Sequence, residues 1–176
     1  MSLLAEEIVE EWLNRNGYFT IRGIKLGNDE IDILAIKPMG GGFKRRHIEV
    51  QVAINPNAYI SKVTKLIQKK RGIGGNSAKN RSKNELRQCV KEWIDTKFSQ
   101  SKKDQLRQSL CPGEWSRELV IHRVKHGEEL LLFNRAGIKI HPLTRIVAEM
   151  RSEETPIEAA TGNDLVNLMC LEKKRR

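Results

Sequence analysis

Two acidic residues lie inside segments whose other residues are those of buried strands. Asp32 stands within EIDILAI and Glu49 within HIEVQVAI, each flanked by apolar residues. An ionised carboxylate inside a strand is costly unless it pairs with a positive group or binds a cation. Two such carboxylates on neighbouring antiparallel strands repel each other, and a bound divalent metal removes that repulsion. The pattern therefore indicates a site for Mg²⁺, with Mn²⁺ as a substitute, because Mg²⁺ takes one or two carboxylates and keeps several waters.

Residues near the two acids could complete such a site. Gln51 follows Glu49 by two residues, so it projects from the same face of the strand and could orient a metal-bound water. The backbone carbonyl of Val50 is a candidate metal ligand, and Glu6 is a candidate outer ligand or water holder on a predicted N-terminal helix. The alternative for Asp32 and Glu49 is an ordinary acid on a half-solvated strand. The alternative for Glu6 is a helix acid that only complements the helix dipole.

Hydrophobic periodicity predicts the elements that position these residues. A helix over residues 3–16 is followed by an antiparallel meander of strands over 18–24, 30–37 and 47–54. The second half is predicted to contain helices over 57–71, 85–98, 128–135, 143–151 and 164–171, a short helix that ends near 110, and strands over 118–124 and 138–142. Its alternation of strands and helices indicates that it extends the first sheet with parallel or mixed strands.

Length and composition favour a single globular domain over residues 1–176. Hydrophobic residues make up 39% and charged residues 31% of the chain, and no apolar run is long enough to span a bilayer. The N-terminus has acids where a secretory signal would have a basic region, so a cytoplasmic protein is expected. The three cysteines form no CxxC pair and the four histidines show no ligand spacing, which argues against a disulfide framework and a structural zinc site.

The net charge of +10 is concentrated in one segment. Residues 56–110 hold 14 basic and four acidic residues, whereas the remainder holds 18 of each. A basic segment of this kind over residues 57–112, inserted between the two halves of the sheet, is suited to binding phosphates of a nucleic acid. The alternative is a solvated surface that only keeps the protein soluble. The candidate contacts are Lys62, Lys65, Lys69, Lys70, Arg71, Lys79, Arg81 and Lys83.

The first third of the chain resembles the PD-(D/E)XK nuclease superfamily. That superfamily has a helix with an acid, a strand with Asp and a strand with Glu-X-Lys, and this chain has AEEIVEEWLNRNGY, DEIDILA and HIEVQ in that order. The sequence is most similar to the small nuclease-like members and the archaeal Holliday-junction resolvases, over about residues 5–53. The resemblance implies an α/β, restriction-endonuclease-like three-layer fold with a central mixed sheet, metal-dependent hydrolysis of phosphodiesters, and DNA as substrate.

One residue departs from the superfamily pattern. Gln51 stands where the motif has lysine, and its amide carries no charge that could neutralise the transition state. Some members that resemble this chain have glutamine there. In others the lysine has moved to a nearby helix, for which Lys62 and Lys65 are the candidates in this sequence.

The expected function is that of a Mg²⁺-dependent DNA endonuclease, for which a homodimer is a common form. The alternatives are a catalytically weak or inactive DNA-binding protein on the same fold, an RNA-directed enzyme, and a scaffold that binds another acidic partner.

Overall fold

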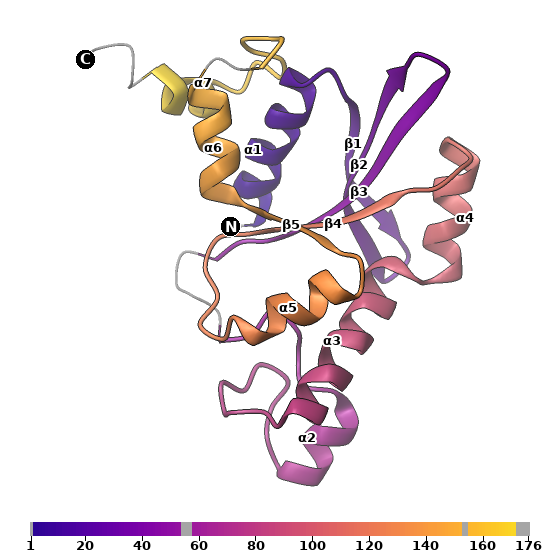
Figure 1. Cartoon of the computed structure of the whole chain (residues 1–176), viewed down its shortest axis with the longest axis vertical. Coiled ribbons are helices and arrows are strands. Elements are labelled where there is room, and N and C mark those ends of the chain that lie inside the picture. Colours follow the sequence, from indigo (N-terminus) through magenta and orange to yellow (C-terminus); the bar gives the residue numbers. More distant parts are fainter. Residues whose placement is uncertain (1, 54–57, 153–154, 172–176) are drawn as a thin grey trace.

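A five-stranded mixed sheet forms the centre of the molecule (Figure 1). The structure is a computed structural model that describes residues 2–53, 58–152 and 155–171. The strands follow each other across the sheet in chain order: β1 (Phe19–Leu26), β2 (Asp29–Met39), β3 (Gly42–Gln51), β4 (Ser116–Ile121) and β5 (Lys139–Pro142). The first three are antiparallel, whereas β4 is parallel to β3 and β5 is parallel to β4. The second half of the chain therefore extends the first sheet, as predicted.

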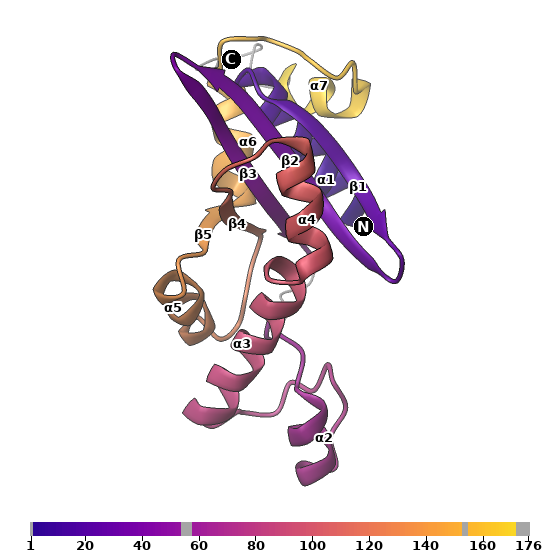
Figure 2. The same ribbon diagram turned by 90° about the vertical axis from the view of Figure 1, so that its right-hand side faces the viewer.

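Helices cover both faces of this sheet, giving a three-layer α/β fold (Figures 1 and 2). One layer contains α1 (Ser2–Arg15), α6 (Leu143–Arg151) and α7 (Asp164–Leu171). The other contains α3 (Lys83–Phe98), α4 (Ser101–Leu110) and α5 (Glu128–Arg135). The remaining helix, α2 (Lys65–Arg71), lies beyond the end of the sheet and packs against α3 through Ile67 and Cys89. Within the described residues, no helix combines the length and the apolar character needed to cross a membrane.

Alternation along the strands explains why two helical layers form. Ile33 and Ala35 of β2 share the α1 face with Ile48 and Val50 of β3, and all four are buried in one core. Leu119 and Ile121 of β4 belong to a second core with α3 and α5. Because successive strand residues point to opposite faces, strands that are apolar on both faces bury both of them only when helices cover each side.

The predicted helix over residues 57–71 is wrong in its first half. Helix α2 begins at Lys65, and residues 58–64 are not helical, while residues 54–57 lie outside the described part of the chain. Thr64 is the N-cap, with its hydroxyl accepting a hydrogen bond from the Ile67 N–H, and the Val63 N–H donates to the Gly75 carbonyl. The apolar spacing of Ile60 and Val63 thus reflects buried loop residues in two different cores.

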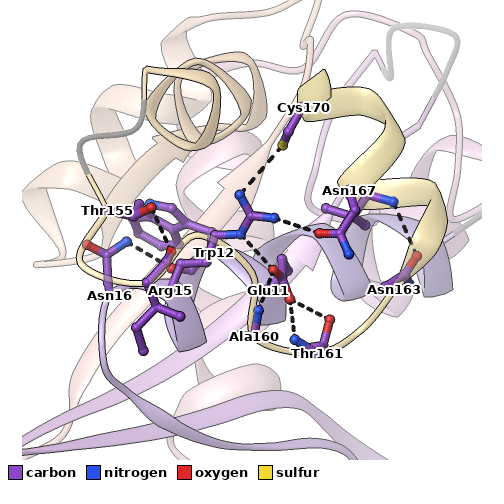
Figure 3. A network of polar contacts seen from close by, with 12 residues as sticks. Glu11, Trp12, Arg15, Asn16, Thr155, Ala160, Thr161, Asn163, Asn167 and Cys170 are labelled. Atoms are coloured by element: carbon purple, nitrogen blue, oxygen red, sulfur yellow. Dashed lines mark hydrogen bonds and ion pairs between the residues drawn. The ribbon is translucent and has the colours of Figure 1, made fainter. Parts of the chain in front are cut away.

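A buried polar network ties the C-terminal segment to α1 (Figure 3). The Glu11 carboxylate accepts hydrogen bonds from Arg15, from the Ala160 N–H, and from the N–H and hydroxyl of Thr161. Arg15 also donates to Asn167 of α7 at 2.8 Å. Burial raises the Glu11 pKa, but these donors outweigh it and hold the pKa below its usual value. The network fixes the position of α7 over the outer face of α1.

Candidate active site

Asp32 lies where the regular pairing of β2 is interrupted on both sides. The ladder between β2 and β3 ends at Ile33 and Ile48, and beyond it the Val50 N–H donates to Asp32 Oδ2 at 2.7 Å. On the β1 side, Gly23 stands opposite Asp32 with a φ of 67°, a value that glycine adopts without strain. The Asp32 carboxylate is thereby fixed to the backbone of β3 beside Glu49.

Glu49 is fully buried, and its carboxylate is hydrogen-bonded to His47, which is in turn hydrogen-bonded to Arg107. Glu49 Oε1 lies 3.0 Å from His47 Nε2, and His47 Nδ1 lies 2.7 Å from Arg107 Nη1. A guanidinium can only donate, so His47 Nδ1 accepts and the imidazole proton resides on Nε2, which donates to Glu49. Burial and the positive charge of Arg107 lower the His47 pKa well below its usual value, so that the imidazole is neutral.

Lys97 of α3 provides the positive charge beside the two acids. Its Nζ lies 2.5 Å from Glu49 Oε2 and 3.9 Å from Asp32 Oδ1. Glu49 Oε2 is buried and makes no hydrogen bond of good geometry, and it forms an ion pair with Lys97. Each carboxylate thus has one oxygen held by a protein N–H and the other directed toward the same cation.

The electrostatics of the site favour the protonated form of both carboxyl groups, mainly because they are buried. Burial, with the charge of Glu49 as the next largest cause, raises the Asp32 pKa to about 7. Burial also raises the pKa of Glu49, although Lys97 opposes this shift. For Lys97, burial favours the neutral amine, but the negative charges of Glu49 and Asp32 outweigh it and raise the pKa. Lys97 and, with a smaller effect on Glu49, Lys103 therefore do not fully offset the cost of burying the two carboxylates, and a divalent cation would offset it further.

The donor set fits a hard cation of the Mg²⁺ type. It consists of two carboxylate oxygens, with Val50 between the acids and its N–H already bonded to Asp32. In residues 2–53, 58–152 and 155–171, no group of three or more His, Cys, Asp or Glu side chains is arranged to hold a metal. A site with two carboxylates leaves positions for waters and substrate oxygens, as Mg²⁺ requires. Coordination by the Val50 carbonyl stays a prediction.

The other two predicted site residues lie in different places. Gln51 is half-buried at the end of β3 and lines a cavity of about 440 Å³ together with Lys97 and Lys62. Glu6 lines a separate hollow with Arg22 and other residues, on the side of the sheet that α1 covers. The structure thus brings Gln51 to the cavity that Lys97 reaches, whereas Glu6 belongs to the opposite helical layer.

Sequence reasoning missed Lys97 and pointed to Lys62 or Lys65 for the displaced lysine. Lys65 is exposed on α2, and Lys62 lines the wall of the cavity. A signal for Lys97 was present in the sequence, because Lys97 follows Trp93 by four residues on the apolar stripe of α3. A lysine on such a stripe places its charged end at the margin of the core.

Of the predicted nucleic-acid contacts, Lys62 lines this cavity, and the others lie on α2, in the loop after it and at the start of α3. Lys65, Lys69 and Lys70 are exposed on α2, and Lys79 and Lys83 are exposed on and after the following loop. The two arginines are already engaged within the protein. Arg71 pairs with Glu85 at 3.0 Å, while Arg81 donates to Ser61 and stacks 3.9 Å from the centre of the Tyr59 ring.

Comparison with known proteins assigns neither a family nor a function. No family model matches the sequence, and no curated protein is similar to it. Among solved structures, the chain is similar to the crystal structure of a protein of unknown function, AF1548. The two share 13% sequence identity with a TM-score of 0.43, over 83% of this chain and 66% of AF1548.

Proposed function

We propose that this protein is a Mg²⁺-dependent DNA endonuclease with a restriction-endonuclease-like fold, similar to the PD-(D/E)XK superfamily. The observation that carries the proposal is the arrangement of Asp32 and Glu49. Each carboxylate has one oxygen fixed by a protein N–H and the other directed to a shared cation position that Lys97 occupies. The three-layer α/β fold and the basic residues of α2 support it.

The residues of the site have distinct roles in this mechanism. Asp32 and Glu49, with the carbonyl of Val50, would hold the metal, which when bound polarises the phosphate and lowers the pKa of a water molecule. Gln51 orients the attacking water through its amide. With a metal held by the carboxylates, the Lys97 ammonium would be available to stabilise negative charge on the phosphate, the role of the lysine that Gln51 replaces.

Contacts to the flanking DNA come from the exposed lysines of α2 and the following loop. They position the phosphate backbone without reading the sequence. Each neutralised phosphate releases counterions, so binding should weaken with salt in proportion to the number of contacts. Lys69→Gln combined with Lys70→Gln should therefore reduce the salt dependence of binding by about two phosphate contacts.

A second candidate function is DNA binding without cleavage. The specific observation in its favour is that Lys97 already compensates Glu49 through a 2.5 Å ion pair. In a protein of this kind, the lysine would act as a permanent internal cation, and the site would serve only to stabilise the fold.

A plasmid-nicking assay with Mg²⁺ or Mn²⁺ separates the two candidates. We expect cleavage by the wild type and a loss of about a thousandfold or more in Asp32→Ala and Glu49→Ala. The control is Glu128→Ala, which removes an exposed acid at the start of α5 and should leave cleavage unchanged. Circular dichroism of each variant establishes that it is folded.

Binding measurements on the same proteins complete the test. Tight DNA binding with no cleavage under either metal would support the binding protein, and Gln51→Lys would then be tested for restored activity. Competition between duplex DNA, branched DNA and RNA identifies the substrate class. Preference for RNA would contradict the proposal of a DNA endonuclease.

A further inference from the structure

A second polar cavity lies at the other end of the β2–β3 ladder from Asp32 and Glu49. Its volume is about 340 Å³ and it opens on the face that α1 covers. The segments that line it are far apart in the sequence. They are the end of α1, the β2–β3 hairpin and the starts of β4 and β5. The lining residues are Trp12, Asn16, Tyr18, Lys37, Lys44, Arg46, Glu118, Lys139 and His141.

Two lysines of this cavity stand directly opposite each other in neighbouring strands. Lys37 pairs with Lys44 in the β2–β3 register, and their Nζ atoms lie 5.6 and 6.0 Å from the centre of the Tyr18 ring. Like charges opposite each other on a sheet are destabilising. The aromatic ring attracts each ammonium group, so both lie beside the same ring despite their repulsion.

These lysines differ from Lys25 of β1 and Lys102 of α4 in having no acidic partner. Among the ion pairs of the described residues, none includes Lys37, Lys44 or Lys139, whereas Lys25 pairs with Glu30 and Lys102 with Asp29. Lys37 instead donates to the Asn16 carbonyl at 2.8 Å, which fixes its direction.

The floor of the cavity is a neutralised ion pair. Arg46 binds Glu118 through Nε and Nη2 at 3.0 and 2.5 Å, and His141 Nε2 lies 2.7 Å from the same carboxylate. Arg46 and Glu118 compensate each other, so the three lysines remain as excess positive charge.

We propose that this cavity binds a phosphate group. Three ammonium groups around a polar floor match an oxyanion with more than one negative charge. The guanidinium of Arg46 lies 4.8 and 5.1 Å from the centres of the Trp12 and Tyr18 rings. Lys37 and Lys44 also lie over Tyr18. Because cationic side chains already cover these rings, we expect the cavity to recognise a phosphate group and not a base stacked on a ring. This inference is independent of the proposed nuclease function.

The test compares phosphate binding by the wild type and a variant with two changes, Lys44→Gln and Lys139→Gln. Both lysines are exposed, so the variant should fold normally. Inorganic phosphate is titrated by calorimetry, with sodium chloride keeping the ionic strength constant. We expect affinity to fall at least about tenfold, since hydrogen bonds to charged groups are the strong ones. The charge-matched control, Lys91→Gln with Lys125→Gln, alters exposed lysines outside the cavity and should bind like the wild type.

Two further arms identify the source of the phosphate. If a duplex oligonucleotide competes with inorganic phosphate in the wild type but not in the Lys44/Lys139 variant, the cavity binds a phosphate of a nucleic acid. Phosphate binding without such competition would identify a free oxyanion. Equal phosphate binding by the wild type and the variant would overturn the proposal, as would an equal loss in the control. Lys37→Gln tests the same cavity independently and should also weaken binding.

Discussion

Buried carboxylates on the two faces of the sheet have different surroundings. Glu118 accepts two hydrogen bonds from Arg46 and one each from Ser116 and His141. Asp32 and Glu49 each accept one hydrogen bond from the protein and share a single lysine. Burial raises the Glu118 pKa, but its donors outweigh burial and hold the pKa well below the usual value. The pKa values of Asp32 and Glu49 are instead raised.

This difference separates a structural carboxylate from one suited to bind a cation. Glu118 has its negative charge fully compensated by donors that belong to the fold, and Glu11 on α1 is compensated in the same way (Figure 3). Asp32 and Glu49 keep two oxygens directed at a position that only a side-chain ammonium fills. Buried charges are stable when fully paired, so these less fully paired carboxylates are the ones to which the proposed metal would bind.

The largest expected effect contrasts Glu118→Gln with Glu49→Gln. Glu118→Gln leaves the buried Arg46 without its counter-charge and should cost about 3–5 kcal/mol of unfolding free energy. Glu49→Gln should cost about 1 kcal/mol or less, because Lys97 is partly exposed and the repulsion with Asp32 is relieved. Urea unfolding of the metal-free proteins at pH 7 measures both. Equal losses would contradict the comparison.

The carboxylates on the two faces should also respond oppositely to pH. The Asp32 pKa is about 7 in the folded protein against an ordinary value of 3.8, so its contribution to stability is complete below about pH 4 and is lost as the pH rises through 7. Relative to Asp32→Asn, the wild type should lose on the order of 3 kcal/mol over this range. The Glu118 contribution, from a lowered pKa, is lost as the pH falls below about 4.5. Urea unfolding in a chelator at several pH values tests this, and a constant difference between wild type and Asp32→Asn would contradict it.

Arg107 should influence metal binding through His47. In Arg107→Met, the His47 Nδ1 loses its donor, and the imidazole is free to take the tautomer that does not donate to Glu49. Loss of such a positioning contact typically lowers metal affinity about 10- to 100-fold. Titration with Mn²⁺ followed by electron paramagnetic resonance measures the change. Arg87→Met, an exposed position on α3, is the charge-matched control, and unchanged Mn²⁺ affinity in Arg107→Met would refute the role.

Lys97→Met gives the smallest expected change and the sharpest distinction between the two candidate functions. Removing the ammonium that competes for Glu49 should raise Mn²⁺ affinity about tenfold, while cleavage at saturating metal should fall. Lys91→Met, on an exposed turn of the same helix, should change neither. A variant that binds Mn²⁺ no better than the wild type would indicate that Lys97 does not stand in the position of the metal.

Local sequence patterns predicted most of the fold. Helices α5, α6 and α7 have the predicted bounds, and β2 contains the whole of its predicted range. The wrong part, residues 58–64, has helical spacing because its apolar side chains are buried by neighbouring elements. Apolar residues spaced by three or four positions can be buried loop residues as well as one face of a helix. In residues 58–64 they are buried loop residues.

Sequence by itself determined which two carboxylates are unusual, because an acid between apolar strand residues is a local pattern. It also located the basic segment, since charge is a sum over residues. Only the tertiary structure decided which groups surround the carboxylates. Lys97 contacts Glu49 directly and Arg107 contacts it through His47, both from helices about 50–60 residues further along the chain. His47, whose position in the sequence shows no ligand spacing, is fully buried beside Glu49. Such contacts depend on how α3 and α4 pack across the sheet, and no local spacing encodes that packing.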